Sequence, residues 1–344
     1  MKNLPDDTSI RELLRQIDLL KKEREAVILA HNYQPPEIQD LADYTGDSLE
    51  LSRIAAKTPA KVIVFCGVRF MGETAAVLSP DKTVLLPVLE AGCTLAEYAT
   101  AEQLREMKKK HPDAVVVTYV NSSAEVKAET DICCTSANAV QIVQSIDRKR
   151  PILFVPDYNL GHYAAKMTGR DLILWDGCCP THALLSTFAV AAARKKWPGA
   201  QVIMHPECKP ETLELADFVG STSGMLTYVK AQPAGTSFIV GTEVGLLHKL
   251  QKENPGKVFH VASDYLICPM MKMTTLKDVK VSLEKMQYIV QVDAAVAQRA
   301  RKAVDAMLLY GGTAKQNPPP RPASPSTATP ETELSIGTES TDTK

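Results

Sequence analysis

The sequence predicts an α/β fold made of three similar units with parallel sheets, arranged around a pseudo-threefold axis and a central active site. Two observations predict this fold. Short β-branched runs alternate with helical stretches between about residues 26 and 275, as in parallel sheets with crossover helices. Polar strand ends, hydroxyl groups and cysteines then recur in the same phase three times along the chain. Loops that follow parallel strands lie at one edge of a sheet, so three units would bring three sets of polar loops together.

A leading amphipathic helix is expected first, over residues 9–25. Its apolar residues fall at helical spacing, and Ser9 with Glu12 forms a capping-box pattern at the start. The strands expected after it are 27–29, 62–65, 115–118, 152–155, 201–204 and 237–240. We also expect a helix over 181–196 and closing amphipathic helices from 276 to 309.

The repeat is defined by three positions with one spacing. The leading residues His31, Tyr119 and His205 each end a predicted strand and lie 88 and 86 residues apart. A hydroxyl follows each of them after 17 residues, and a cysteine follows that hydroxyl after a further 43 to 46. The hydroxyls are Ser48, Ser136 and Thr222, and the cysteines are Cys93, Cys179 and Cys268.

These spacings predict six segments. They are a leading helix (1–25), three α/β repeats (26–112, 113–199 and 200–275), closing C-terminal helices (276–311) and a disordered tail rich in Pro, Ser and Thr (312–344).

Charge and hydropathy exclude two classes of partner. The 39 Lys and Arg balance the 40 Asp and Glu, so there is no excess of positive charge to hold a nucleic acid backbone. No run of 18 apolar residues occurs, and the N-terminus lacks an apolar leader, so we expect no membrane partner and a cytoplasmic protein.

The eight cysteines are expected to serve in metal binding, in catalysis or as buried core residues, because a reducing compartment disfavours disulfides. No CxxC pair occurs, so ligands for a metal would come from distant segments. Three thiolates suit a zinc ion with an open position, or a four-iron cluster with one iron free of protein. Cys178 competes with Cys179 for the second position, and the repeat favours Cys179. The remaining cysteines are expected to be buried.

The polar repeat residues allow two interpretations. The hydroxyls around Ser48, Ser136 and Ser221 are ordinary helix N-caps, and they are equally suited to bind carboxylate or phosphate beside free helix N–H groups. Taken singly, His31 and His205 are expected to have structural roles. Around one axis, the group His31, Tyr33, Tyr119, Asn121, His205 and Glu207 forms a set of acid–base groups and hydrogen-bond donors.

Several ordered motifs resemble the quinolinate synthase family. They are AHNYQ (30–34), GDSLELS (46–52), GVRFMGETA (67–75), TYVNSSAEVKA (118–128), TSANA (135–139), PDYNLG (156–161), WDGCCPTH (175–182), HPEC (205–208), GSTSG (220–224), GTEVG (241–245) and CPMMKMTTL (268–276). The resemblance covers about residues 10 to 310.

The resemblance implies three α/β/α sandwich domains and a transferase of pyridine nucleotide biosynthesis. The enzyme would condense iminoaspartate with dihydroxyacetone phosphate to quinolinate, releasing phosphate and two waters, for de novo NAD biosynthesis. It would hold a [4Fe-4S] cluster whose open iron acts as a Lewis acid in dehydration, and it would be coupled functionally to an L-aspartate oxidase. Cys93, Cys179 and Cys268 match the cluster ligands.

The resemblance also implies two further groups of site residues. The positions implied to bind substrate are His31, Ser48, Asn121, Ser136, His182, Ser221 and Thr222. The positions implied to transfer protons and contact intermediates are Tyr33, Tyr119, His205 and Glu207. Some relatives carry a CxxCxxC run near the last ligand, whereas here Pro269 follows Cys268. The alternatives are another cluster-dependent hydro-lyase and a non-catalytic small-molecule binding protein.

Overall fold

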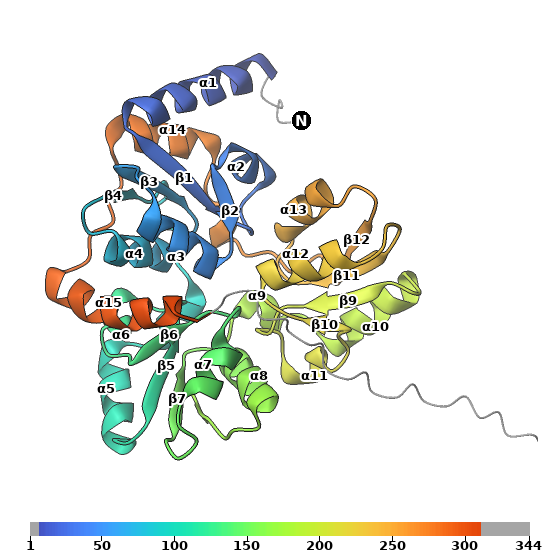
Figure 1. Ribbon diagram of the computed structural model, residues 1–344. Helices are drawn as coiled ribbons and strands as arrows, with labels where there is room; N and C mark the ends of the chain where they lie inside the picture. Colours follow the sequence, from blue (N-terminus) through green and yellow to red (C-terminus); the bar gives the residue numbers. More distant parts are fainter. Residues whose placement is uncertain (1–6, 311–344) are drawn as a thin grey trace, which may run out of the picture.

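The computed structural model describes residues 7–310. The tail predicted at 312–344 lies outside the described residues, as do the first six residues of the predicted leading segment. Within the described range, Figure 1 shows three α/β units grouped around a common centre.

Each unit contains a four-stranded parallel sheet with the same strand order, in which the first strand of the unit is flanked by the second and third. The first sheet runs β2-β1-β3-β4, with β1 Ala26–His31, β2 Tyr44–Gly46, β3 Val62–Cys66 and β4 Thr83–Leu85. The second runs β6-β5-β7-β8, with β5 Val115–Tyr119, β6 Ile132–Cys134, β7 Ile152–Val155 and β8 Ile173–Leu174. The third runs β10-β9-β11-β12, with β9 Gln201–Met204, β10 Phe218–Val219, β11 Ser237–Gly241 and β12 Val258–Val261. The predicted α/β fold with three sheet-containing units is confirmed.

Helices cover both faces of the sheets. In chain order they are α1 Asp7–Glu23, α2 Pro36–Leu41, α3 Ser48–Lys57, α4 Arg69–Leu78, η1 Thr94–Tyr98, α5 Ala101–Lys110, α6 Ala124–Lys127, α7 Ala139–Ser145, α8 Tyr158–Thr168, α9 Pro180–Ala183, α10 Thr187–Lys196, α11 Pro210–Leu213, α12 Thr222–Ala231, α13 Leu246–Glu253, η2 Met270–Lys272, α14 Leu276–Lys285 and α15 Ala294–Leu308. None of these helices combines the length and apolar character needed to cross a membrane.

The alternation of side chains along the central strands divides the core. In β1, Val27 and Leu29 join a large apolar cluster that also draws residues from the second and third sheets, while Ile28 packs on the other face beneath α1 and α14. Because successive side chains of a strand point to opposite faces, a strand that is buried on both faces reads as a continuous apolar run. This is why the central strands were the easiest elements to predict.

In each unit, one aspartate side chain accepts a hydrogen bond from the backbone of the first strand. Asp43, Asp131 and Asp217 each accept a hydrogen bond from a backbone N–H of the unit's first strand, at Ile28, Val116 and Val202, over 2.7 to 2.8 Å. Each aspartate lies 12 residues after the leading residue of its unit, so it is a further repeat position beside the hydroxyls and cysteines. These bonds confirm that the three units are equivalent in structure.

The expected elements differ from the structure in three places. The leading helix begins at Asp7, so Ser9 lies inside it and does not cap it. The helix expected over 181–196 is two helices, α9 and α10, because the Ser186 side chain accepts from the Ala189 N–H and starts a new helix. The second and fourth strands of every sheet were missed, because most contain only two or three residues.

Two closing helices complete the fold (Figure 1). Helix α14 packs against α1 over the first sheet. Helix α15 lies between the first two units, in contact with α4 of the first and with α6 and β6 of the second. Its buried side chains, Ala300, Ala303, Val304 and Met307, make it part of the core.

Candidate active site

The carboxyl ends of the central strands meet at the centre of the molecule. His31 and Tyr119 are the last residues of β1 and β5, and His205 follows β9 directly. All three side chains are buried, at 6%, 5% and 3% exposure. Parallel sheets place their ligand sites at this edge, so the three units point their functional loops at one place.

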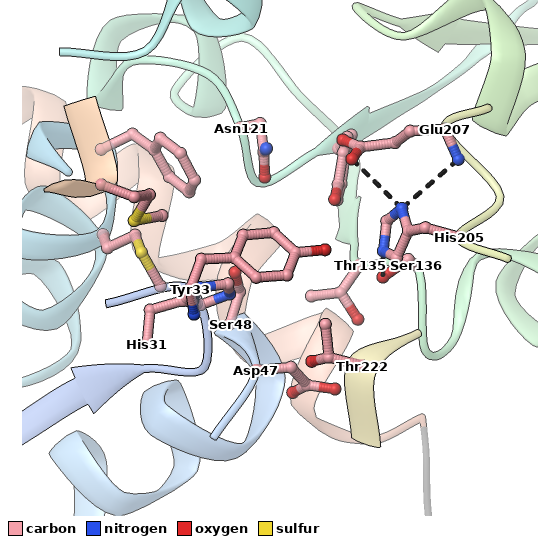
Figure 2. A pocket seen from close by; sticks show the side chains of 14 residues that line it. His31, Tyr33, Asp47, Ser48, Asn121, Thr135, Ser136, His205, Glu207 and Thr222 are labelled. Carbon is pink, nitrogen blue, oxygen red and sulfur yellow. Dashed lines mark hydrogen bonds and ion pairs between the residues drawn. The ribbon is translucent and has the colours of Figure 1, made fainter. Parts of the chain in front are cut away.

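A cavity occupies this centre, and side chains from all three units line it (Figure 2). Nine predicted site residues line it, namely His31, Tyr33, Ser48, Tyr119, Asn121, Ser136, His205, Glu207 and Thr222. The other five, His182, Ser221 and the cysteines Cys93, Cys179 and Cys268, do not line it. The residues missed by sequence reasoning are Asp47, Thr135, Phe70, Met71 and Met271.

Glu207 lies in the wall of the cavity and is almost completely buried. Its Oε2 is 2.8 Å from Nδ1 of His182 and 3.1 Å from Nδ1 of His205. Burial opposes ionisation of this carboxyl, but the two imidazoles outweigh burial and lower its pKa below the usual range. Its Oε1 has no hydrogen-bond partner among the described residues. A buried oxygen without a partner at a cavity wall is suited to accept a proton or a hydrogen bond from a ligand.

His182 connects Glu207 to a tyrosine on the opposite side. Its Nε2 is 2.9 Å from Oγ1 of Thr242, and that oxygen is 2.6 Å from the Tyr33 hydroxyl. Since His182 Nδ1 faces the carboxylate, its Nε2 accepts from Thr242 when the ring is neutral, and Thr242 in turn accepts from Tyr33. His182 therefore orients site residues from behind the cavity wall, and Thr242 is a further member of the site.

The two tyrosines and His31 are uncharged in this environment. Burial, reinforced by the Glu207 charge, raises the pKa of Tyr33 and Tyr119 well above the usual value. Burial lowers the pKa of His31 to about 3, with further contributions from His205 and Lys272. The Tyr33 N–H donates to Nδ1 of His31 over 3.1 Å, so the neutral ring carries its proton on Nε2.

The hydroxyl loops differ from the capping interpretation in two units. Asp47, and not Ser48, caps α3, accepting from the N–H groups of Leu49 and Glu50. Asn138 occupies the cap position of α7, two residues beyond Ser136, and the Ser136 hydroxyl is 3.1 Å from Nε2 of His205. The cap position is thus occupied by another residue, and Ser48 and Ser136 line the cavity.

The third unit divides the two roles between neighbouring residues. Ser221 caps α12 by accepting from the Gly224 N–H over 3.1 Å, as the capping interpretation expected. Thr222 lines the cavity and accepts from Nδ2 of Asn32 over 2.9 Å. Because Asn32 belongs to the first unit, this hydrogen bond joins the first unit to the third.

One backbone hydrogen bond identifies the equivalent cysteine in each unit. Residues just after β3, β7 and β11 donate to the carbonyl two positions before a cysteine: Arg69 to Ala91, Tyr158 to Gly177 and Val244 to Leu266, over 2.7 to 2.9 Å. The corresponding cysteines are Cys93, Cys179 and Cys268, so the structure assigns the repeat position to Cys179 and not to Cys178. All eight cysteines are free thiols, and Cys66, Cys133, Cys134 and Cys208 are buried as expected.

The three repeat cysteines share a similar electrostatic environment. A backbone N–H three positions later, at Ala96, His182 and Met271, acts to lower the pKa of each thiol. The charge of Cys93 interacts with those of both Cys179 and Cys268. Burial raises the pKa of Cys93 to about 12 and raises those of Cys179 and Cys268. Burial thus disfavours a free thiolate at each position, and a bound cation would offset this effect.

Cys179 also belongs to a compact group with His182 and Glu207, whose candidate ligand atoms all lie within 4.8 Å of one another. This group places the Cys179 thiol close to the Glu207 carboxylate in the cavity wall.

Comparison with known proteins identifies the family of this chain. The family model described as quinolinate synthetase A protein matches residues 15–309. The chain is 52% identical over 303 residues to the quinolinate synthase of Methanoregula boonei, covering 88% of this chain and 99% of the relative. It is 53% identical over 297 residues to that of Methanosarcina barkeri (86% and 97%), and 54% identical over 296 residues to that of a Geobacter species (86% and 97%). The chain therefore belongs to the quinolinate synthase family and, like these relatives, is an enzyme.

Proposed function

We propose that this enzyme condenses iminoaspartate with dihydroxyacetone phosphate to quinolinate, with release of phosphate and two waters, as a step of de novo NAD biosynthesis. The observation that carries the proposal is the cavity between the three units, in whose wall the buried Glu207 keeps one oxygen without a partner among the described residues. Glu207 also lies beside Cys179, one of three cysteines at equivalent positions of the units. Family membership supports the same reaction.

A [4Fe-4S] cluster fits the residues present. Cys93, Cys179 and Cys268 would hold it, one from each unit, at positions that share the same backbone hydrogen bond. With three protein ligands, the cluster supplies an iron that is open to substrate and acts as a Lewis acid toward a leaving hydroxyl.

The hydroxyl loops would bind the anionic substrates. Ser48, Ser136 and Thr222 bring hydroxyl groups from three units to one cavity. The buried Oδ1 of Asn121 has no hydrogen-bond partner within residues 7–310. Such an arrangement fixes a dicarboxylate and a triose phosphate relative to each other, which lowers the entropic cost of forming the two new bonds.

Proton transfers would fall to the buried titratable groups. Glu207 stays ionised and can accept a proton at Oε1, while Tyr33, Tyr119 and the Nε2 of His31 keep protons that they can donate. Because Oε2 is already engaged by two imidazoles, Oε1 is the atom through which Glu207 acts on substrate. His205 supports Glu207 and orients the Ser136 hydroxyl.

Two broader features of the proposal concern the cell. Eight free thiols suit a reducing compartment such as the cytoplasm. Iminoaspartate is an unstable imine, so we propose functional coupling to an L-aspartate oxidase that forms it.

The test replaces each repeat cysteine with serine and uses Cys178→Ser as the matched control. We expect the three repeat variants, purified without oxygen, to lose labile sulfide, brown absorbance and quinolinate formation, whereas Cys178→Ser keeps all three. A full cluster in any repeat variant would contradict the ligand set. A cluster in the wild type without quinolinate formation would favour another hydro-lyase, and absence of iron and sulfide would favour a binding protein.

A further inference from the structure

Two buried carboxylates lie directly behind two of the repeat cysteines. Asp157 and Glu243 occupy equivalent positions, two residues after the last residue of β7 and of β11, and both have 0% exposure. Neither lines the cavity, and neither belongs to the set of residues expected to touch substrate. A buried carboxylate is costly unless its oxygens are hydrogen-bonded, so their bonding partners indicate what they do.

Each carboxylate bridges a helix start to a cysteine. Asp157 accepts from the Leu160 N–H of α8 through Oδ1 (2.7 Å) and from the Cys179 N–H through Oδ2 (3.2 Å). Glu243 accepts from the Gly245 N–H through Oε2 (2.7 Å) and from the Cys268 N–H through Oε1 (3.1 Å). One arrangement therefore occurs twice, at the two equivalent places.

A second hydrogen bond holds the chain just before each of these cysteines. The carbonyl two positions earlier is already held by the backbone N–H that follows Asp157 or Glu243, at Tyr158 and Val244. Each cysteine backbone is thus fixed on both sides to the strand end of its own unit. In the first unit, Val68 occupies the equivalent position and has no carboxylate to offer Cys93.

We propose that Asp157 and Glu243 are positioning residues that fix Cys179 and Cys268 for binding the iron–sulfur cluster, while Cys93 is held by its backbone alone. The inference rests on the proposed three-cysteine cluster. Outer-sphere groups of this kind commonly change metal affinity by about 10- to 100-fold when they are removed.

The amide variants Asp157→Asn and Glu243→Gln are the sharpest test. Each keeps the size of the side chain but replaces one acceptor oxygen with an NH2 group, which then faces a backbone N–H. One of the two bridging bonds is lost, and a repulsive contact replaces it. Asp157 is the cleaner case, because Glu243 also pairs with Lys272 over 2.8 Å.

The control is Asp131→Ala, which removes a carboxylate from the backbone N–H of Val116 in the second unit, away from any repeat cysteine. It weakens the sheet without touching a cluster ligand. A loss of cluster that merely follows global destabilisation would appear in this variant as well.

The measurement is anaerobic iron release to a chelator, with the electron paramagnetic resonance spectrum of the reduced cluster. We expect about 10- to 100-fold faster release and an altered spectrum for Asp157→Asn and Glu243→Gln, but values near wild type for Asp131→Ala. In the cluster-free chain, hydrogen exchange at the Cys179 and Cys268 segments should rise in the respective variant. Equal release rates in all proteins would overturn the inference and leave the proposed function intact. A wild type without iron and sulfide would overturn the proposed function itself.

Discussion

Glu207 is the residue at which the electrostatics of the site converge. Two imidazoles share its Oε2 and stabilise the negative charge there, while Oε1 has no hydrogen-bond partner among the described residues. This asymmetry separates the two functions of one carboxyl group. One oxygen anchors the group, and the other is left for chemistry.

Replacing Glu207 with glutamine should separate catalysis from cofactor binding. Glutamine keeps the shape but cannot accept a proton at Oε1, so we expect turnover to fall by about 10²- to 10⁴-fold while iron and sulfide content stays at the wild-type level. Turnover is measured as the steady-state rate of quinolinate formation, and cluster content is measured by sulfide analysis of the same preparation. Near-normal turnover would remove Glu207 from the proton-transfer role.

His31 gives a prediction about pH. Its pKa is about 3 in the folded chain, against an ordinary value near 6.5 in the unfolded chain. Below about pH 6.5 the unfolded chain binds a proton on His31, whereas the folded chain does not. The folded state therefore becomes less stable as pH falls from about 6.5 toward 3. When pH falls from about 7.5 to 5.5, the free energy of unfolding should decrease by about 1.4 kcal/mol less in His31→Gln than in wild type. Urea unfolding at the two pH values measures this difference. Parallel pH curves for the two proteins would contradict the burial of a neutral His31.

At the level of residues, chemistry in a repeated phase could be predicted from the sequence. His31, Tyr119 and His205 share a spacing, so their meeting in space followed from three similar units. Thr242, Asp157 and Glu243 were missed because they act from behind the cavity wall, through hydrogen bonds that only the fold reveals. Phe70 and Met271 line the cavity but resemble ordinary core residues in the sequence.

At the level of elements, the loops after the strands determine which side chains face the cavity. In the first two units another residue takes the cap position, and the repeat hydroxyl lines the cavity. In the third unit the pair Ser221 and Thr222 divides capping from cavity lining. The position of a hydroxyl relative to the helix start thus separates a structural role from a ligand-facing one.

Ser221→Ala and Thr222→Val form a matched pair for this element. We expect Ser221→Ala to cost about 1 kcal/mol of stability through loss of the cap, with little change in KM. Thr222→Val removes a hydroxyl from the cavity and the acceptor of Asn32, so KM should rise more than stability falls. Thermal unfolding and KM for dihydroxyacetone phosphate separate the two effects. A larger KM change in Ser221→Ala would support the predicted substrate-binding role of Ser221.

Half of the strands could be predicted and half could not, for one physical reason. The first and third strands of each sheet are buried on both faces and leave runs of three or more β-branched or apolar residues, as in β5. The second and fourth strands are shorter or less buried: β8 has two residues, and β12 is mostly half-exposed. Their pairing depends on the neighbouring strand, so the local sequence carries little trace of it.

At the scale of the whole molecule, the site exists only where the three units meet. His31 and Ser48 come from the first unit, Asn121 and Ser136 from the second, and Glu207 from the third. The contacts between the units therefore set the geometry of the cavity. Between the first and second units, this contact runs largely through α15, which binds both of them.

Helix α15 should therefore influence substrate binding without touching the cavity. Met307 is completely buried in the cluster that joins the units, and Met307→Ala should cost about 2–5 kcal/mol and raise KM, because the walls of the cavity move relative to each other. Leu309, two residues later and 84% exposed, provides the matched control. We expect Leu309→Ala to leave both thermal stability and KM near wild type. If Met307→Ala lowered the melting temperature while KM stayed unchanged, the cavity geometry would not depend on this helix, and each unit would hold its own loops in place.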